Sequence, residues 1–595
     1  MCGLVTIFSY KDSSSLVDET ELNNIRESMI NRGPDGAGTW ISEDRRVGLA
    51  HRRLAIIDPG PSGAQPMALR DEKGKERLQI IYNGEIYNFR QIRKDLIAQG
   101  CRFRTNSDTE VLLHLYDLYG VDMLNRLRGM FAFAVWDRDK QGLLLARDPY
   151  GIKPLYYNDD GTTLRAASTV KALLAGNRIS KTPNAAAHVG FLTLGYVPEP
   201  HTLYTEIKCV PAGNFLWVSK DGRKNQEKYF DFRKKMLELE NTPQKKSAAQ
   251  LHSALIETAK CHLIADVPVG LFLSAGLDSA SIMALAAEVS NSQLKTVTLR
   301  FEEYKDTCFD EAPLANKISS IYGTDHETRK ITATDFRSQK NNLIEAMDQP
   351  TIDGVNTYFI AKETSNTGLK AAISGVGGDE LFAGYGSFRQ IPALVSGLGW
   401  IPFIGKIGVA FRIVSGPILK RFTSAKYASF FEYSSDYGSA YLLRRGLFLP
   451  WELTHFMDPE FVQKGWSELD LRNGLNQTIV GVKNSINRVT LMESAWYMRN
   501  QLLRDADWAG MAHSIEIRTP LVDAALFEKV AARGYMKSDM AFSPAKPLPL
   551  NIINRKKTGF MTPVSEWMEN EDVNLNSDPG YRGWAKYVYN QFQKV

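Results

Sequence analysis

The sequence predicts an α+β domain with layered antiparallel sheets and helices outside, followed by an α/β domain with a doubly wound parallel sheet and a helical C-terminal part. Two patterns along the chain support this prediction. Residues 1–210 contain short strand-like runs separated by turn residues, which is typical of antiparallel sheets. From residue 248, continuous apolar runs alternate with helical periodicity, which is typical of a parallel sheet covered by helices on both faces.

The antiparallel part begins with short strands whose ends carry turn residues. Residues 79–82 precede Asn83-Gly84, a pair that favours a turn, and the apolar run 132–136 ends before Asp137. After residue 213 a polar, charged passage extends to Ser247. We therefore predict a first domain at residues 1–215, a linker at 216–247 and a second domain at 248–595.

The second domain alternates helices with buried strands. We expect an amphipathic helix at 251–263, a strand at 269–273, a helix at 279–289 and a strand at 295–301. A glycine-containing turn separates the first strand from the second helix. Beyond residue 387 the chain is expected to be mainly helical.

One stretch in the second domain has the composition of a membrane segment. Residues 390–405 carry no charge, and apolar character resumes after Lys406 as far as Ile413. Prolines, glycines, Lys406 and Arg412 interrupt the stretch before about 20 apolar residues accumulate, so we expect no membrane span. A buried pair of helices is the favoured interpretation, and contact with a membrane surface is the alternative.

Composition and charge limit the classes of partner that the protein is expected to bind. The 595 residues are 44% apolar and 23% charged, as in ordinary globular proteins. The net charge of +5 is spread along the chain without a dense Lys/Arg tract, which argues against a nucleic-acid partner. Five scattered cysteines argue against a zinc site and a disulfide framework, and no signal-peptide pattern is present, so we expect a cytoplasmic protein. The oligomeric state stays open, with a homodimer as one possibility.

Cys2 directly follows the initiator methionine. Removal of Met1 would leave a residue that carries both a thiol and a free α-amine. The amine titrates near pH ~8, so it can accept the thiol proton while the sulfur attacks a carbonyl. Cys2 is therefore a candidate N-terminal nucleophile.

Downstream motifs resemble the class II glutamine amidotransferase domain, an N-terminal-nucleophile hydrolase. They appear in the order that the family shows, which makes the set far more specific than any single motif. The matching segments are Arg32-Gly33-Pro34-Asp35 and residues 51–58, 82–88, 106–110, 129–133 and 146–157.

This resemblance implies a role for each residue of a glutamine site. Asn83 and the Gly84 N–H would form an oxyanion hole for Cys2. Arg53 would bind the α-carboxylate, and Glu85 and Asp108 would meet the α-ammonium. His51 is expected to be structural. The glutamine-binding set is completed by the segment Leu54, Ala55, Ile56 and Ile57.

A second candidate centre follows the apolar strand at 269–273. The turn Ser274-Ala275-Gly276-Leu277-Asp278-Ser279 resembles the PP-loop of ATP pyrophosphatases, in which backbone N–H groups close around pyrophosphate. Residues 372–385 form another Gly-rich turn that is similar to the second nucleotide segment of asparagine synthetases. By this resemblance, the ATP-binding residues are Leu273, Ser274, Gly276, Asp278, Ser279, Leu299, Ser374, Gly375 and Asp379, and Asp278 and Asp379 would hold Mg²⁺.

The C-terminal part continues the resemblance at residues 503–507, 512–523 and 555–560. Family members carry a catalytic lysine ahead of the last of these motifs. Lys537 is the nearest match, and an ordinary solvated lysine is the alternative.

The combined resemblance implies an asparagine synthetase-type enzyme that hydrolyses glutamine and uses ATP to amidate a carboxylic acid through an acyl-adenylate. Two departures bear on the acceptor: Ala275 replaces a loop glycine, and Val376 stands where the family carries an acidic residue. Aspartate is therefore one candidate acceptor, and a sugar uronate or another biosynthetic acid is the other. The alternatives from other classes are a sugar-phosphate or purine-pathway amidotransferase, a β-lactam-forming synthetase and a non-catalytic scaffold.

Overall fold

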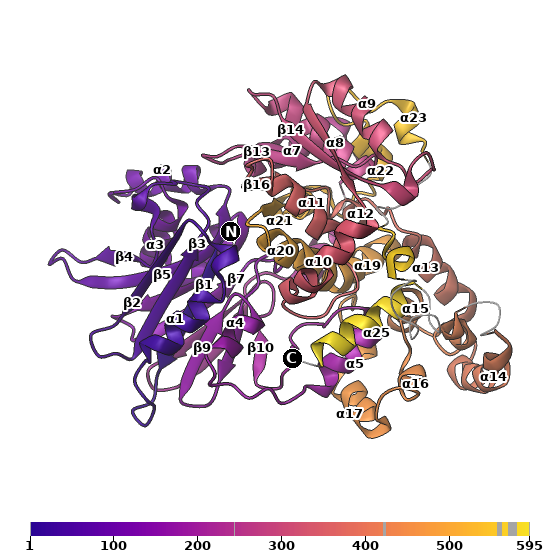
Figure 1. Cartoon of the computed structure of the whole chain (residues 1–595), viewed down its shortest axis with the longest axis horizontal. Helices are drawn as coiled ribbons and strands as arrows, with labels where there is room; N and C mark the ends of the chain where they lie inside the picture. The colour runs from indigo at the N-terminus through magenta and orange to yellow at the C-terminus, as the bar shows by residue number, and fades with distance from the viewer. Residues whose placement is uncertain (1, 243, 420–423, 556–561, 569–579, 594–595) are drawn as a thin grey trace.

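The computed structural model describes the chain except for residues 1, 243, 420–423, 556–561, 569–579 and 594–595. Met1 and the motif at 555–560, apart from Arg555, therefore lie outside the described residues. Figure 1 shows the N-terminal strands on the left, the parallel sheet above and most of the later helices below it.

The first part contains two six-stranded sheets whose paired strands are antiparallel. Apolar residues of both sheets, among them Leu4, Leu49 and Leu145, share one buried cluster, so the sheets pack face to face. The first sheet has the order β10 (Ile207–Cys209), β8 (Tyr156–Asp159), β9 (Thr163–Ala167), β1 (Gly3–Ser9), β3 (Val47–Arg53), β2 (Gly36–Ile41). The second has the order β12 (Lys224–Lys228), β11 (Asn214–Ser219), β7 (Gly142–Arg147), β6 (Gly129–Asp137), β5 (Glu76–Ile86), β4 (Met67–Arg70).

Helices cover the outer face of each sheet. Leu22 and Ile25 of α1 (Glu19–Glu27) and Val170 of α4 (Val170–Ala175) pack on the first sheet. Helices α2 (Phe89–Ala98) and α3 (Asp108–Tyr119) pack on the second. The result is a helix–sheet–sheet–helix sandwich, which confirms the predicted layered antiparallel domain.

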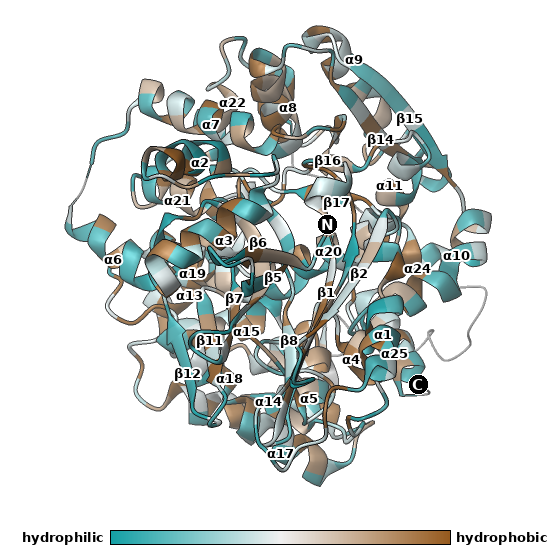
Figure 2. Ribbon diagram, turned by 90° about the vertical axis from the view of Figure 1, so that its left-hand side faces the viewer, coloured by the Kyte–Doolittle hydropathy of each residue, from teal (hydrophilic) through white to brown (hydrophobic). Residues whose placement is uncertain are grey.

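The second sheet continues past residue 215. Strand β12 pairs with β11, and all its residues are exposed. Its residues are hydrophilic, as the colour of its ribbon in Figure 2 shows. Helix α6 (Phe232–Asn241) follows. The segment predicted as a linker at 216–247 thus contains a strand and a helix.

The second part is built on a five-stranded sheet in which every pair is parallel. Its order is β15 (Asp325–Ile331), β14 (Lys295–Phe301), β13 (Val269–Phe272), β16 (Ala371–Ile373), β17 (Glu516–Arg518). Helices α7 (Ala248–His262), α8 (Leu277–Val289) and α9 (Ala312–Tyr322) bury one face, and α10 (Ala333–Ala346), α11 (Val355–Ser365) and α20 (Arg504–Met511) bury the other. The predicted doubly wound parallel sheet is confirmed.

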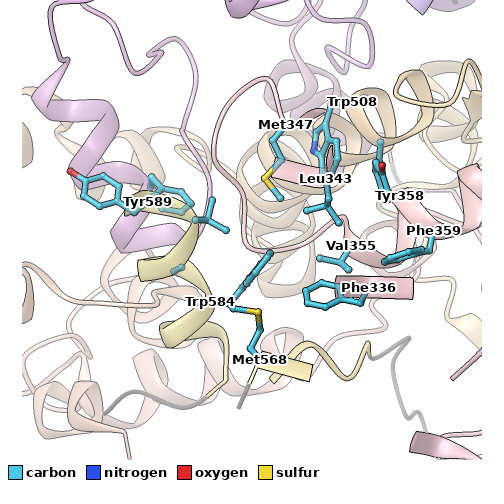
Figure 3. Packing of buried hydrophobic residues seen from close by; sticks show 14 of the residues in the cluster. Phe336, Leu343, Met347, Val355, Tyr358, Phe359, Trp508, Met568, Trp584 and Tyr589 are labelled. Carbon is cyan, nitrogen blue, oxygen red and sulfur yellow. The ribbon is translucent and has the colours of Figure 1, made fainter. Parts of the chain in front are cut away.

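The C-terminal segment completes the core on one side of this sheet. Trp584 of α25 (Tyr581–Phe592) lies 6.2 Å from Phe336 of α10, measured between ring centroids. Figure 3 shows both rings, with Met568 beside Trp584. The last helix of the chain therefore belongs to the same hydrophobic core as the parallel sheet.

Two expectations from the sequence are wrong. Asn83 and Gly84 form no turn, because they lie inside the eleven-residue strand β5. The pair α13 (Ser387–Leu398) and α14 (Ile404–Leu419) is helical but only partly buried, since Ile391 of α13 is buried whereas Val414 of α14 is 75% exposed. The C-terminal part is mainly helical, as expected, and its strand β17 returns to the parallel sheet.

Candidate functional site

The Cys2 side chain lies at the start of β1, buried between β5 and the segment after β3. Its backbone N–H donates to Asn83 Oδ1 at 2.9 Å, and its Sγ lies 4.0 Å from the Leu54 carbonyl oxygen. Burial raises the pKa of the thiol, while the contact with Leu54 and the charge of Arg53 act in the opposite direction. The thiol therefore needs an adjacent base to become a nucleophile.

Asn83 and Gly84 are held next to Cys2 by strand β5. Asn83 is fully buried, and the described part of the chain offers its Nδ2 group no hydrogen-bond partner. Gly84 has a φ of +156°, and a Cβ there would lie 2.1 Å from the Met130 carbonyl oxygen. Only glycine fits this backbone position, which explains why an Asn-Gly pair occurs in mid-strand. A free amide donor beside a thiol is the arrangement that an oxyanion hole requires.

Two of the three predicted glutamine-binding charges face the same region. Carbonyl oxygens of the following loop hold the Arg53 guanidinium, with Nη1 donating to Gly60 at 2.7 Å. Asp108 begins α3, where its carboxylate accepts from Ile86 N–H at 3.2 Å and from the Tyr82 hydroxyl at 3.1 Å. Burial raises the Asp108 pKa to about 6, so the carboxylate is ionised at neutral pH.

Glu85 contacts a residue of the second domain, which the sequence did not reveal. It lies 3.5 Å from the Arg518 guanidinium, which comes from β17 of the parallel sheet. Burial and the charge of Glu516 raise the pKa of Glu85 well above its ordinary value. Glu85 therefore sits where the two domains meet.

The segment 54–57 also connects the domains. Ala55 N–H donates to Asp35 at 2.8 Å, and the same carboxylate oxygen accepts from Lys370 of the second domain at 2.8 Å. The Ile56 carbonyl accepts from Asp266 N–H at 3.0 Å. Leu54 and Ile56 share an apolar cluster with Ala371 and Met511.

His51 is placed as a structural residue. Its ring is buried in β3, where Nε2 lies 2.9 Å from the Tyr82 carbonyl oxygen. Burial lowers its pKa to about 3, so the imidazole is neutral at neutral pH.

The two Gly-rich turns follow neighbouring parallel strands. β13 leads into α8 and β16 leads into α12 (Gly378–Leu381), and β13 pairs with β16. The order of the sheet reverses between these strands, and ligands of doubly wound sheets bind at such a switch point.

Hydrogen bonds shape the first turn around two serines. Ser274 Oγ and Ser279 Oγ are 2.8 Å apart, and the Gly276 N–H donates to Ser274 Oγ at 3.2 Å. No side chain caps the N-terminus of α8, which leaves its first N–H groups available to an anion. Ala275 is absent from the residues with positive φ, so the missing loop glycine does not strain the backbone.

The second turn packs against the first at glycine positions. A Cβ on Gly375 would lie 2.7 Å from Ser279 N, and one on Gly378 would lie 2.3 Å from Asp278 Oδ1. Ser374 N–H donates to the Arg518 carbonyl at 2.8 Å, which anchors this turn to β17. The glycines allow the close approach that brings the two aspartates together.

Asp278, Asp379 and Lys537 converge between the turns. Lys537 is the first residue of α22 (Lys537–Ala541), and its Nζ lies 2.5 Å from Asp278 Oδ2 and also pairs with Asp379. Burial would lower the pKa of Lys537, but the two carboxylates outweigh it and raise the pKa. Lys537 is therefore part of this cluster and is not an ordinary solvated lysine.

The carboxylates of Asp278 and Asp379 lie close enough together to contact the same Lys537 ammonium group. Such a pair suits Mg²⁺, which is usually bound by one or two protein carboxylates together with substrate phosphates. Among the described residues, no group of three or more His, Cys, Asp or Glu side chains could hold a metal ion alone. The donor set thus fits a cation that arrives with a nucleotide.

The two predicted apolar nucleotide contacts are separate. Leu273 belongs to the cluster beneath α7 and α8, and Leu299 to the cluster on the opposite face of the sheet. Both side chains are 2% exposed. Leu273 and Leu299 are therefore core residues, and any contact that they made with a nucleotide would use their backbone atoms.

Two charged groups lie at this centre besides the predicted site residues. Arg555, which begins the motif at 555–560, has its Nη1 3.4 Å from the Ala275 carbonyl oxygen. Glu380 accepts from the Tyr385 hydroxyl at 2.9 Å, and burial together with Asp379 raises its pKa to about 8. Glu380 is visible in the sequence as the residue after Asp379, but nothing in the sequence indicates its burial.

An apolar cluster joins the two centres. Tyr87, Met130 and Ile152 of the first domain pack with Met498 and Val522 of the second, and Val376 lies against them. A cavity of about 600 Å³ opens beside this cluster, lined by Tyr87, Tyr150 and Val522 among others. The cavity contains none of the predicted catalytic residues.

Comparisons with known proteins match a family to each part of the chain. Residues 1–230 match the family described as "Glutamine amidotransferase domain", and residues 250–576 match "Asparagine synthase". The chain is 31% identical to asparagine synthetase [glutamine-hydrolyzing] 1 of Bacillus subtilis over 96% of this chain and 88% of that protein. It is 30% identical to the amidase chry2 of Gibberella zeae, over 65% of this chain and 60% of that protein.

A solved structure of the glutamine phosphoribosylpyrophosphate amidotransferase of Bacillus subtilis aligns at 18% identity and a TM-score of 0.30, covering 55% of this chain and 65% of that one. The family assignment does not depend on this alignment, because the asparagine synthase match spans more than half of the chain. The chain therefore belongs to the glutamine-hydrolysing asparagine synthetase family and is a ligase of that type.

Proposed function

We propose that this enzyme transfers the amide nitrogen of glutamine to a carboxylic acid that ATP has activated as an acyl-adenylate. The observation that carries the proposal is the junction itself: the Cys2–Asn83 pair and the Asp278–Asp379–Lys537 cluster belong to one chain, with buried apolar residues of both domains between them.

In the first domain, removal of Met1 would make the Cys2 amine the base for its own thiol. The sulfur then attacks the glutamine amide carbon, and Asn83 Nδ2 and the Gly84 N–H stabilise the negative charge on the oxygen. The C–N bond breaks, ammonia leaves with the proton, and water hydrolyses the thioester to glutamate. Arg53, Asp108 and Glu85 hold the α-carboxylate and α-ammonium.

In the second domain, an acid oxygen would attack the α-phosphorus of ATP and displace pyrophosphate. Mg²⁺ bound by Asp278 and Asp379 would offset phosphate charge when it is present. Lys537 supplies a second positive charge at the same point, and the first turn of α8 donates N–H groups to the leaving pyrophosphate. Ammonia then attacks the acyl carbon and AMP leaves.

The apolar cluster supports transfer between the domains. Ammonia that reached water at neutral pH would be protonated and lose its nucleophilic lone pair, so a dry route preserves it. Val376, Met130 and Val522 line the junction with apolar surface.

We propose that the acceptor is a carboxylic acid other than free aspartate, such as a sugar uronate or a biosynthetic acid. Val376 packs in the apolar cluster and can neither accept a proton nor orient an ammonium group. Aspartate is the second candidate, which the names of the asparagine synthetase relatives favour.

Mass spectrometry tests this choice. The enzyme is incubated with glutamine, ATP, Mg²⁺ and a panel of acids that includes aspartate, and AMP and amide products are measured. We expect an amide and matching AMP from an acid other than aspartate. Asparagine formed at ordinary enzymatic rates would instead identify aspartate as the acceptor.

A further inference from the structure

Helix α14 presents a row of apolar side chains to solvent, although it belongs to the folded second domain. We define the α14 face as Ile407, Ala410, Ile413 and Val414 of the helix together with Trp400 and Phe403, which precede it. Trp400, Phe403 and Val414 are about three-quarters exposed, and Ile413 is 66% exposed. Exposed clusters of large apolar side chains on a folded domain mark interaction sites.

The opposite side of α14 is fixed to the protein. Ile404 is 6% exposed, and Gly408 approaches the backbone of Glu432 so closely that a Cβ would lie 2.1 Å from its nitrogen. Arg412 forms an ion pair with Glu432 at 2.8 Å, and the Phe411 and Phe431 ring centroids are 4.9 Å apart. The helix therefore has one orientation, and the α14 face points outward.

The charged residues of the segment that carries the α14 face are all basic. From Leu381 to Phe431 the sequence contains no Asp or Glu. Lys406 lies on the outward side of α14, and Arg389 of α13 is also exposed. The nearest carboxylate along the chain, Glu432, is already paired with Arg412. A surface of large apolar side chains, carried by a segment whose charged residues are all basic, is complementary to anionic lipid.

The face is also placed so that a flat surface can reach it. Figure 1 shows α14 at the right-hand edge of the molecule, on the side opposite the N-terminal domain. Within the described residues, every helix is too short or too polar to cross a bilayer. Contact with a membrane would therefore be with its surface.

We propose that the α14 face binds the surface of a bilayer that contains anionic lipids. Trp400, Phe403 and Ile407 enter the boundary between headgroups and acyl chains, while Lys406, on the outward side of α14, remains at the level of the phosphates. This attachment leaves the glutaminase domain in water. A second copy of the chain is the alternative occupant of the same face.

Vesicle co-sedimentation of the full-length enzyme tests the proposal. We expect the protein to sediment with mixed phosphatidylglycerol–phosphatidylcholine vesicles and much less with phosphatidylcholine alone. The double variant Trp400→Ser/Phe403→Ser loses two aromatic anchors, so its partition should fall about tenfold or more. Lys406→Glu should weaken binding to the anionic vesicles and leave the weak binding to neutral vesicles unchanged.

The matched control is Ile97→Ser/Leu118→Ser, which removes two apolar side chains of 52% and 47% exposure from the first domain. This variant should sediment like the wild type, and all variants should share its thermal unfolding temperature. The proposal is overturned if the wild type stays in the supernatant with anionic vesicles or if Trp400→Ser/Phe403→Ser binds them unchanged. A wild-type dimer that this double variant converts to monomer, without vesicle binding, would assign the face to a second copy.

Discussion

The Asn83 side chain has two ends with different surroundings. Oδ1 accepts the Cys2 N–H at 2.9 Å, and Nδ2 is free of protein partners among the described residues. Asn83→Asp keeps an acceptor oxygen and removes the donor. We expect kcat for glutamine hydrolysis to fall about 10²–10³-fold while KM changes little, because the lost bond forms only in the transition state. Steady-state glutaminase kinetics measure this.

Asn225→Asp on the exposed strand β12 is the control for the same chemical change in the same domain. It should leave both kinetic constants at their wild-type values. If Asn83→Asp kept most of the wild-type kcat, Asn83 would have no part in the oxyanion hole.

Asp108 predicts a pH dependence of glutamine recognition. Burial raises its pKa to about 6, so its negative charge is fully present above that pH and is lost as the pH falls through about 6. The attraction for the glutamine ammonium group disappears with the charge. We therefore expect kcat/KM for glutamine to decrease as the pH falls through about 6, and a pH–rate profile measures it. Asp108→Asn should have a low kcat/KM with no inflection in this range; an unchanged inflection would assign it to another group.

At the scale of elements, the close approach of the two Gly-rich turns predicts the effect of a single methyl group. In Gly378→Ala the new Cβ would lie 2.3 Å from Asp278 Oδ1 and push the turns apart. Misplacement of this size typically costs about 10²-fold in rate. We expect that loss in pyrophosphate release measured with ammonium and an acceptor acid, with glutaminase activity retained.

Gly386→Ala is the control, because its Cβ would lie 3.5 Å from the nearest atom, which is an ordinary van der Waals distance. It should release pyrophosphate at nearly the wild-type rate. Equal losses in both variants would mean that the contact between the turns does not position the aspartates.

The local sequence pattern predicted helices and strands correctly where tertiary contacts favour the same structure. The strand predicted at 295–301 is β14, and the helices predicted at 251–263 and 279–289 are α7 and α8 with small shifts at their ends. The Asn83-Gly84 pair failed as a turn because its special backbone is set by Met130 on the next strand. The exposure of α14 could not be predicted from the sequence either, because an apolar helical pattern does not indicate whether another part of the protein covers the helix.

At the scale of the whole molecule, a buried ion pair connects the domains beside Cys2. Arg32 donates to both Asp507 oxygens at 2.6 and 3.1 Å and to the Cys2 carbonyl at 3.2 Å. In Arg32→Ala the Asp507 charge stays buried without its partner, which costs about 3–5 kcal/mol. We expect a lower unfolding temperature and glutamate in excess over amide product, because the loosened junction loses ammonia.

Arg178→Ala removes a different Arg–Asp pair of the first domain, with Asp18, whose arginine side chain is 58% exposed. Such a pair contributes about 0–1 kcal/mol, so stability and the glutamate-to-amide ratio should stay near wild type. If Arg32→Ala kept the wild-type ratio, this ion pair would play no part in coupling the two reactions.

The sequence could predict candidate residues for each of the two proposed centres but not the contacts that connect the centres. Cys2, Asn83, Asp278 and Asp379 stand in local motifs that can be read one at a time. Arg32 and Asp507 are separated by 475 positions, and only the fold brings them together. The same holds for the contact of Glu85 with Arg518 and for the apolar packing of Val376.

The central claim is that nitrogen released at Cys2 reaches the ATP-activated acid without entering solution. Glutamine with an isotopically heavy amide nitrogen is supplied together with ATP, Mg²⁺, the acceptor acid and an excess of ordinary ammonium, and the amide product is analysed by mass spectrometry. The account predicts that most of the product carries the heavy nitrogen and that Cys2→Ala incorporates only ordinary nitrogen. Wild-type product that carries the isotope ratio of the bulk ammonia pool would contradict it.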